Sequence, residues 1–182
     1  MTAETRKRRT IVSSSHLVSD EASELSEFEF GLIIASNAFN RWIVRCMSAA
    51  GYGDLNTLDI EVLHSVNHRT RDKKLADLCF ILNVEDTHTV SYALKKLMRS
   101  GLVAGTRSGK EITYAVTAEG REACERYRQI REDCLVKSMG AFGGGSDGDL
   151  NAQFGQQIGQ VADVLRALSG MYDQAARAAA SL

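Results

Sequence analysis

The residues EDTHTVSYALKKLMRSGLVAGTRSGKEITYAVTAEGR, from Glu85 to Arg121, carry the pattern from which the fold can be predicted. The first part has apolar residues at the spacing of one helix face, namely Val90, Leu94, Leu97 and Met98. Gly101 is placed to end this helix, because glycine adopts the left-handed conformation of a helix C-terminus without strain. The second part alternates apolar and polar residues through Ile112, Tyr114 and Val116. A helix followed by a β-hairpin is therefore expected.

The outer face of this helix and the turn of the hairpin are basic. From Ser91 to Lys110 the chain has five basic residues and no acidic one, whereas the formal net charge of all 182 residues is −1. Near-neutral overall charge gives no sign of nucleic-acid binding, so such a function would have to come from this local positive surface.

Ten side chains on the helix and the hairpin turn are candidate DNA contacts. Four on the first exposed helical turns are placed to reach base edges or phosphates: His88, Thr89, Ser91 and Tyr92. Five basic ones are placed to meet phosphates: Lys95, Lys96, Arg99, Arg107 and Lys110. Ser108, in the hairpin turn, is the tenth candidate. Glu85 and Asp86 are expected to cap the helix. The alternative interpretation of both sets is a solvated, charged surface.

Three helices are expected before this stretch. The segment 24–50 has apolar residues on more than one side, which is typical of a helix with two neighbours, such as its own domain and a second subunit. Asn56 with Asp59 three residues later predicts the N-terminus of a second helix, and a third should end at Asn83. Helices, turn and hairpin together predict a winged helix-turn-helix.

Two further helices are expected after it. Thr117 can cap the first, and five glycines mark a loop over residues 140–149. The last helix has few charges and a long apolar stripe, which favours packing against a second subunit. The fold class is thus mainly α with a small β-hairpin wing, flanked by N- and C-terminal dimerisation helices. Its predicted parts are a disordered basic, Ser-rich tail (1–23), an N-terminal dimerisation helix (24–55), a winged helix-turn-helix (56–117) and C-terminal helices (118–182).

Other features mainly exclude classes of protein. No apolar run approaches the roughly 20 residues of a membrane span, so a cytoplasmic protein is expected. The basic run at residues 6–9 could add phosphate contacts, or be a solvated charge cluster. The four cysteines lack the spacing of a zinc site or a disulfide framework, so neither metal nor cofactor is predicted. A redox switch would need a thiol of a second subunit.

An effector pocket is a further hypothesis. Five aromatic or basic residues fall where the first helix, the second helix and the helix after the hairpin should meet: Trp42, Arg45, His64, His68 and Tyr127. Such a mixture could bind an anionic ligand. The alternative is core packing of the two large aromatic rings, with the histidines at the surface.

The order of these elements resembles the MarR family of bacterial winged-helix transcription regulators. The resemblance rests on Val90-Ser91-x-x-Leu94-x-x-Leu97-x-x-x-Gly101-Leu102-Val103, the hairpin, and Val116-Thr117-Ala118-Glu119-Gly120. It implies a homodimer that binds pseudo-palindromic double-stranded DNA, with the helix at Val90 in the major groove and the wing near the minor groove. It also implies a response to a small molecule or an oxidant.

Two positions depart from the family's pattern. The family's wing usually carries Asp-x-Arg, whereas this one reads Arg-Ser-Gly-Lys-Glu from Arg107, so Arg107 or Lys110 would have to serve as the minor-groove residue. Tyr92 stands where the family often has arginine. A winged-helix module that binds protein instead of DNA is therefore the rival hypothesis. An enzyme is not expected, because no catalytic motif is found.

Overall fold

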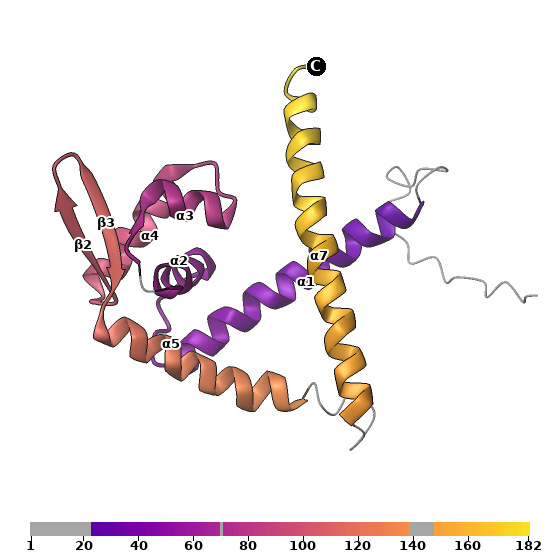
Figure 1. The fold of residues 1–182 in the computed structure, drawn as a ribbon, viewed down its shortest axis with the longest axis horizontal. Coiled ribbons are helices and arrows are strands. Elements are labelled where there is room, and N and C mark those ends of the chain that lie inside the picture. The colour runs from indigo at the N-terminus through magenta and orange to yellow at the C-terminus, as the bar shows by residue number, and fades with distance from the viewer. Residues whose placement is uncertain (1–22, 70, 139–147) are drawn as a thin grey trace, which may run out of the picture. The chain divides into compact units, whose positions relative to one another are not determined.

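A computed structural model describes residues 23–69, 71–138 and 148–182 of the chain. The predicted tail, apart from Ser23, and all of the glycine-rich loop before Gly148 lie outside these residues. The chain forms two compact units, residues 1–127 and 128–182, and each is described by itself. The fold is mainly helical with a small antiparallel sheet, as the sequence predicts (Figure 1).

The first unit contains most of the regular elements. Its helices are α1 (Ser23–Ala49), α2 (Thr57–Asn67), α3 (Leu75–Leu82) and α4 (Thr87–Arg99). Its strands are β1 (Lys73–Lys74), β2 (Val103–Ser108) and β3 (Glu111–Val116). The boundary between the units falls within α5 (Ala118–Arg131), which continues as the π-helical turn η2 (Glu132–Val136). The second unit is completed by α7 (Gly148–Ala179).

The predicted helix boundaries of the first unit are confirmed by their caps. Asn56 accepts a hydrogen bond from the backbone N–H of Asp59 at 3.0 Å, and the Asp59 carboxylate accepts one from the N–H of Asn56 at 2.9 Å. Asn83 ends α3 in the left-handed conformation, with φ of 52°. Gly101 follows α4 with φ of 73°, a value that glycine adopts without strain.

The core of the first unit lies between α2, α3 and α4. Apolar side chains from all three helices are fully buried there, including Ile60, Leu63, Leu78, Val90, Leu94 and Leu97. Because α4 buries the face on which Val90 and Leu94 lie, its opposite face stays free for another partner. Met98, predicted to be buried with them, is only half-buried and lies against Gly105 of β2.

The sheet has three strands and not two, in the order β1-β3-β2. The sequence prediction missed β1, where Lys73 pairs with Tyr114 and Lys74 with Thr113. Two consecutive lysines show no alternation of apolar and polar residues, so the sequence carries no signal of a strand here.

The predicted turn of the wing was also too long. Arg107 and Ser108 belong to β2 and pair with Ile112 and Glu111, which leaves only Gly109 and Lys110 in the turn.

The base of the wing is joined closely to the start of α5. The Thr117 hydroxyl donates to the carbonyl of Gly101 at 2.7 Å and accepts from the N–H of Gly120 at 3.0 Å. The N–H of Thr117 donates to the carbonyl of Leu102 at 3.1 Å. A Cβ atom on Gly120 would lie only 2.1 Å from that same carbonyl oxygen. Position 120 therefore has no room for a side chain.

The C-terminal end of α1 packs within the first unit. Ile43, Cys46 and Met47 are buried there, whereas large apolar side chains between Leu25 and Phe39 are exposed. These are Leu25, Phe30, Leu32, Ile33, Ile34 and Phe39. A soluble domain seldom exposes so many neighbouring apolar side chains on one helix unless they meet a partner.

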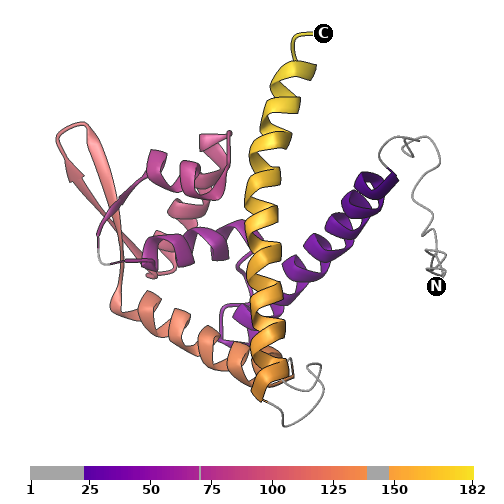
Figure 2. The ribbon, with the colours of Figure 1, turned by 45° about the vertical axis from the view of Figure 1, so that its right-hand side comes forward.

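The second unit contains one long helix, α7, of 32 residues (Figure 2). Within this unit its apolar side chains are exposed: Ile158, Val161, Val164, Leu165, Met171 and Tyr172. No helix in the described parts of the chain is both long and apolar enough to cross a membrane.

Replacing Gly120 by alanine should destabilise the protein by about 2 kcal/mol or more, because the added methyl group collides with a backbone carbonyl that has little freedom to move. Chemical denaturation monitored by circular dichroism measures this. Gly53→Ala is the matched control, since its Cβ would meet only the Ser48 side chain, at 3.2 Å to its hydroxyl oxygen. Equal stability of the two variants would contradict the close approach.

Candidate nucleic-acid interface

The N-terminal end of α4 is fixed by its cap and leaves its first side chains exposed. The Asp86 carboxylate accepts a hydrogen bond from the N–H of His88 at 2.9 Å, and the Thr89 hydroxyl donates to the Asp86 carbonyl at 2.7 Å. Asp86 is therefore the cap, as predicted. The imidazole of His88 and the side chain of Thr89 are exposed at the point where a helix entering a groove first meets the bases.

The middle of the outer face of α4 combines an aromatic ring with positive charge. Tyr92 is 69% exposed, and the ammonium of Lys95 lies 5.4 Å from the centre of its ring. Together with Met98 and Arg99 these two residues line a hollow of about 550 Å³ on the surface. No acidic side chain lines this hollow, so its field is positive. Ser91, by contrast, is half-buried.

Lys96 lies on the inner side of α4, unlike the other basic residues predicted to contact DNA. Its ammonium is 2.7 Å from the carboxylate of Asp59, which is 2% exposed, and it also donates to the carbonyl of Asp54 at 2.5 Å. Its charge therefore compensates a buried carboxylate at the start of α2. At 3.6 residues per turn, Lys96 falls on the same side of the helix as the buried Ala93, which the apolar pattern of Val90, Leu94 and Leu97 does not include.

The turn of the wing is exposed and basic. The Arg107 side chain folds along the turn, and its Nε donates to the carbonyl of Gly109 at 3.1 Å. Lys110 is exposed in the turn itself. Lys74 of β1 lies 2.7 Å from the carboxylate of Glu111, so the acid next to the turn is already paired with a base. The wing thus presents Arg107 and Lys110 without a competing free acid.

Two of the five predicted effector residues are in contact. His64 and Tyr127 meet edge to face with ring centres 4.6 Å apart, and burial lowers the pKa of His64 below its ordinary value. The Nε2 atom of His64 is buried without a hydrogen-bond partner. Of the other three predicted residues, Trp42 is half-buried, and Arg45 and His68 are exposed.

The cysteines are predominantly buried. Cys46, Cys79 and Cys124 are buried and Cys134 is exposed, and none forms a disulfide. Burial raises the pKa of the Cys124 thiol to about 11 and raises that of Cys79 as well. These two thiols are therefore protonated and unreactive at neutral pH. Among the residues that the structure describes, no group of side chains is arranged to hold a metal ion.

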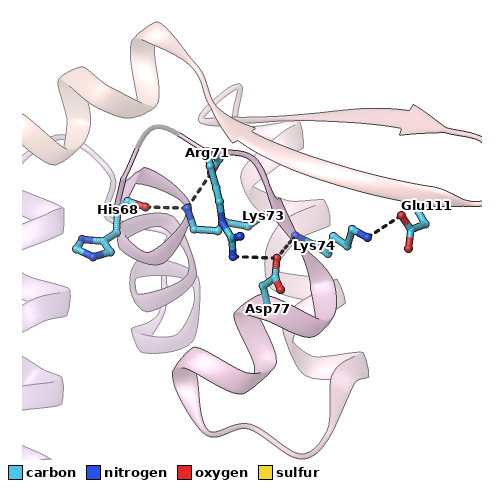
Figure 3. Close-up of polar contacts among 6 residues, drawn as sticks. All are labelled: His68, Arg71, Lys73, Lys74, Asp77 and Glu111. Atoms are coloured by element: carbon cyan, nitrogen blue, oxygen red, sulfur yellow. Dashed lines mark hydrogen bonds and ion pairs between the residues drawn. The ribbon is translucent and has the colours of Figure 1, made fainter.

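One feature was not foreseen from the sequence. Lys73 is 2% exposed, and its ammonium donates to the carbonyls of His68 and Arg71 at 2.7 and 2.8 Å (Figure 3). The loop before β1 is therefore folded around a buried positive charge. Beside this loop is a cavity of about 320 Å³ lined by Arg69, Arg71 and Arg121. Arg121 lies 50 and 52 residues after the other two arginines in the chain, so only the folded structure shows that the three line one cavity.

The winged unit matches a known family of domains. A sequence profile described as a winged helix DNA-binding domain matches residues 55–120, from the start of α2 to the first turn of α5. No curated protein sequence matches the chain.

Solved structures extend the likeness beyond the winged domain. A mutant of MarR from E. coli covers 72% of this chain and 93% of its own, with 17% identity and a TM-score of 0.58. The YusO protein from Bacillus subtilis covers 80% and 98%, with 16% identity and a TM-score of 0.55. The chain has the MarR-type winged-helix fold. The family resemblance predicted from the sequence is thus confirmed for the fold. NadR in complex with 4-hydroxyphenylacetate has the same fold, at 15% identity over 78% of this chain and 91% of its own, with a TM-score of 0.58.

In this MarR-type fold, Lys96→Ala should destabilise the protein by about 1–2 kcal/mol, because it leaves the Asp59 carboxylate buried without a cation. Lys95→Ala removes the same charge one residue earlier from an exposed position, and its cost should stay below about 0.5 kcal/mol. Urea denaturation of both variants measures the difference. If Lys95→Ala proves as destabilising as Lys96→Ala, the structural role given to Lys96 is wrong.

Proposed function

We propose that this chain is a homodimeric transcription regulator that binds a pseudo-palindromic DNA site. The observation that carries the proposal is the acid-free outer face of α4, flanked by a basic wing turn. In the proposed complex α4 enters the major groove, and Arg107 or Lys110 lies near the minor groove. Of the residues predicted from the sequence, His88, Thr89 and Tyr92 would meet bases, with Ser91 beside them.

The phosphate contacts are assigned to the exposed basic residues. Lys95, Arg99, Arg107 and Lys110 are exposed and point away from the core of the winged unit. Lys96 is left out of this set, because its ammonium is engaged with Asp59. Ser108 would support the backbone at the wing turn. Fixed positive charges attract phosphates at any sequence, so these residues would supply affinity, whereas the N-terminal part of α4 would supply sequence preference.

The proposed dimer is supported by the exposed apolar faces of α1 and α7. A two-fold arrangement presents the same patch on both subunits, and it would bury side chains such as Ile33 and Phe39 of α1. It would also place two copies of α4 on one face of the DNA, about 10 base pairs apart. Doubling the contacts is needed because a single α4 helix reaches few base pairs.

Response to a small molecule is part of the proposal. It is supported by solved structures of the same fold that hold ligands: NadR with 4-hydroxyphenylacetate, and CouR from Rhodococcus jostii RHA1 with p-coumaroyl-CoA. In this chain the contact between His64 and Tyr127 joins α2 to α5. A ligand that separated the two rings would alter how α5 is held against the winged unit. Trp42, Arg45 and His68 remain predicted members of such a site.

Removing the phosphate-contact residues should weaken binding to all DNA sequences alike. Lys95→Ala and Arg107→Ala should each lower the magnitude of the slope of log K against log salt by about two, because the dimer presents each residue twice. Fluorescence anisotropy with the DNA upstream of its own gene, over a series of salt concentrations, measures this slope.

Arg177→Ala in α7 is the control for net charge, since it removes one exposed arginine outside the candidate DNA interface. Its slope should equal that of the unchanged protein. A scrambled duplex tests specificity. Failure of the unchanged protein to prefer its own DNA, with no salt dependence, would favour the rival protein-binding module.

Breaking the proposed α1 interface should yield monomers. Ile33 is 59% exposed in the single chain, and Ile33→Glu would place a charge in the middle of the apolar contact. Light scattering coupled to size exclusion should show a dimer for the unchanged protein and a lower mass for this variant. Ser48→Glu, at an exposed position of the same helix but beyond the apolar stretch that ends at Phe39, is the control. A dimer that persists at all concentrations in Ile33→Glu would place the interface elsewhere.

A further inference from the structure

The cavity at the base of the wing has the properties of an anion site. It lies between the end of α2, the loop before β1, the last residues of β3 and the first turn of α5. We infer that it binds a small organic dianion, such as a phosphate monoester or a dicarboxylate. The inference does not depend on DNA binding by α4, because the site shares no residue with that interface.

The cavity forms because β1 is short. β1 pairs with β3 only at Tyr114 and Thr113, so Ala115 and Val116 have no partner on that side. The chain before β1 runs past them as a loop instead of a strand. Arg71 and Asp72 in that loop line the cavity on one side, and Ala115 and Val116 line it on the other.

The charge of the lining is strongly positive. Arg69, Arg71 and Arg121 line the cavity with a single acid, Asp72, so three positive charges and one negative leave a formal +2. A guanidinium group matches the two oxygens of a carboxylate or a phosphate with two parallel hydrogen bonds. A dianion would neutralise this lining, whereas a monoanion would leave it positive.

Two backbone carbonyls beside the cavity are held in place by Lys73. The buried ammonium of Lys73 fixes the carbonyls of His68 and Arg71, on either side of Arg69 (Figure 3). Arg69 itself has φ of 63°, a conformation that a long side chain rarely adopts outside a constrained loop. Because the carbonyls of His68 and Arg71 are already held by Lys73, a ligand would not have to supply the free energy of holding them.

The arginines retain capacity for a ligand. One nitrogen of Arg121 donates to the carbonyl of Val116 at 2.9 Å, which orients the guanidinium at the cavity wall. Arg71 approaches Asp77 at 3.8 Å in an exposed ion pair, a weak contact that an anion can displace. All three arginines are exposed to solvent and are therefore accessible.

The size and remaining lining of the cavity favour an organic body over a bare inorganic ion. Its volume of about 320 Å³ is at the lower end of the range for small-molecule sites. Val66, Ala115 and Val116 provide apolar surface next to the charges, and the amide of Asn67 can both donate and accept. A ligand with a compact apolar part and a doubly charged end fits this combination.

The position of the cavity argues against a DNA phosphate as its occupant. The pair Val103 and Val116 is five steps along the hairpin from the pair Ser108 and Glu111 next to the turn. At about 3.4 Å per residue the two ends are roughly 17 Å apart. The wing turn, where a DNA contact is proposed, and the cavity therefore lie at opposite ends of the wing.

Calorimetric titration of the full chain with phenyl phosphate and with phthalate tests the inference. Both should bind, and benzyl alcohol, which lacks the charge, should not. Arg69→Asn and Arg121→Gln should each weaken binding about tenfold or more. Asparagine tolerates the positive φ at position 69, and the glutamine amide can still donate to the Val116 carbonyl, so both variants should keep the fold. Unchanged circular dichroism and melting temperature verify this.

Arg107→Gln at the wing turn is the matched control and should bind phenyl phosphate like the unchanged protein. Absence of binding by the unchanged protein, or equal affinity in Arg69→Asn, overturns the inference. A third outcome also overturns it: no binding of phenyl phosphate, together with a flatter salt dependence of DNA binding in Arg69→Asn, would make the cavity a contact for the DNA backbone. Loss of DNA binding alone leaves the anion site unaffected, so the two proposals fail separately.

Discussion

The approach of Gly120 to the carbonyl of Leu102 is the constraint on which the winged unit depends. Leu102 lies directly after the turn that ends α4 and directly before β2, so this one contact sets the positions of α4, the wing and α5 together. The Thr117 hydroxyl reinforces it by bonding to both sides of the junction. The Thr-x-x-Gly pattern therefore has a physical cause: a capping hydroxyl is needed at one end of the helical turn and an absent side chain at the other.

The two faces of α4 differ in their contacts, as the neighbouring residues Lys95 and Lys96 show. Lys95 lies over the Tyr92 ring on the outer face, whereas Lys96 reaches inward to Asp59 and so joins α4 to the capped start of α2. An ammonium in this position holds the helix against its neighbour without adding to the outer field. The orientation of the outer face of α4 thus depends on the ion pair between Lys96 and Asp59 on its inner side.

Much of the fold could be predicted from the sequence because its signals are local. Caps at Asn56, Asp86 and Thr117, and the stop at Gly101, follow from preferences of single residues. Three features were not predictable. β1 has no alternation of apolar and polar residues, the carboxylate bound by Lys96 lies 37 residues earlier in the chain, and Arg121 comes to line one cavity with Arg69 only when the chain folds. The candidate interface on α4 was therefore predictable as a face, whereas the roles of individual lysines on it required the structure.

The buried ammonium of Lys73 has a consequence for how this protein can vary. A charged residue usually tolerates replacement because it lies in water, but this one is surrounded by protein and bonded to two carbonyls. Arginine would put a larger, planar group in place of the compact ammonium, and methionine would leave both carbonyls without a donor, so lysine suits this position. Lys74, one residue later and exposed, carries no such restriction. Among related chains that keep this loop, position 73 should therefore vary as little as an apolar core residue, whereas position 74 should accept more kinds of side chain.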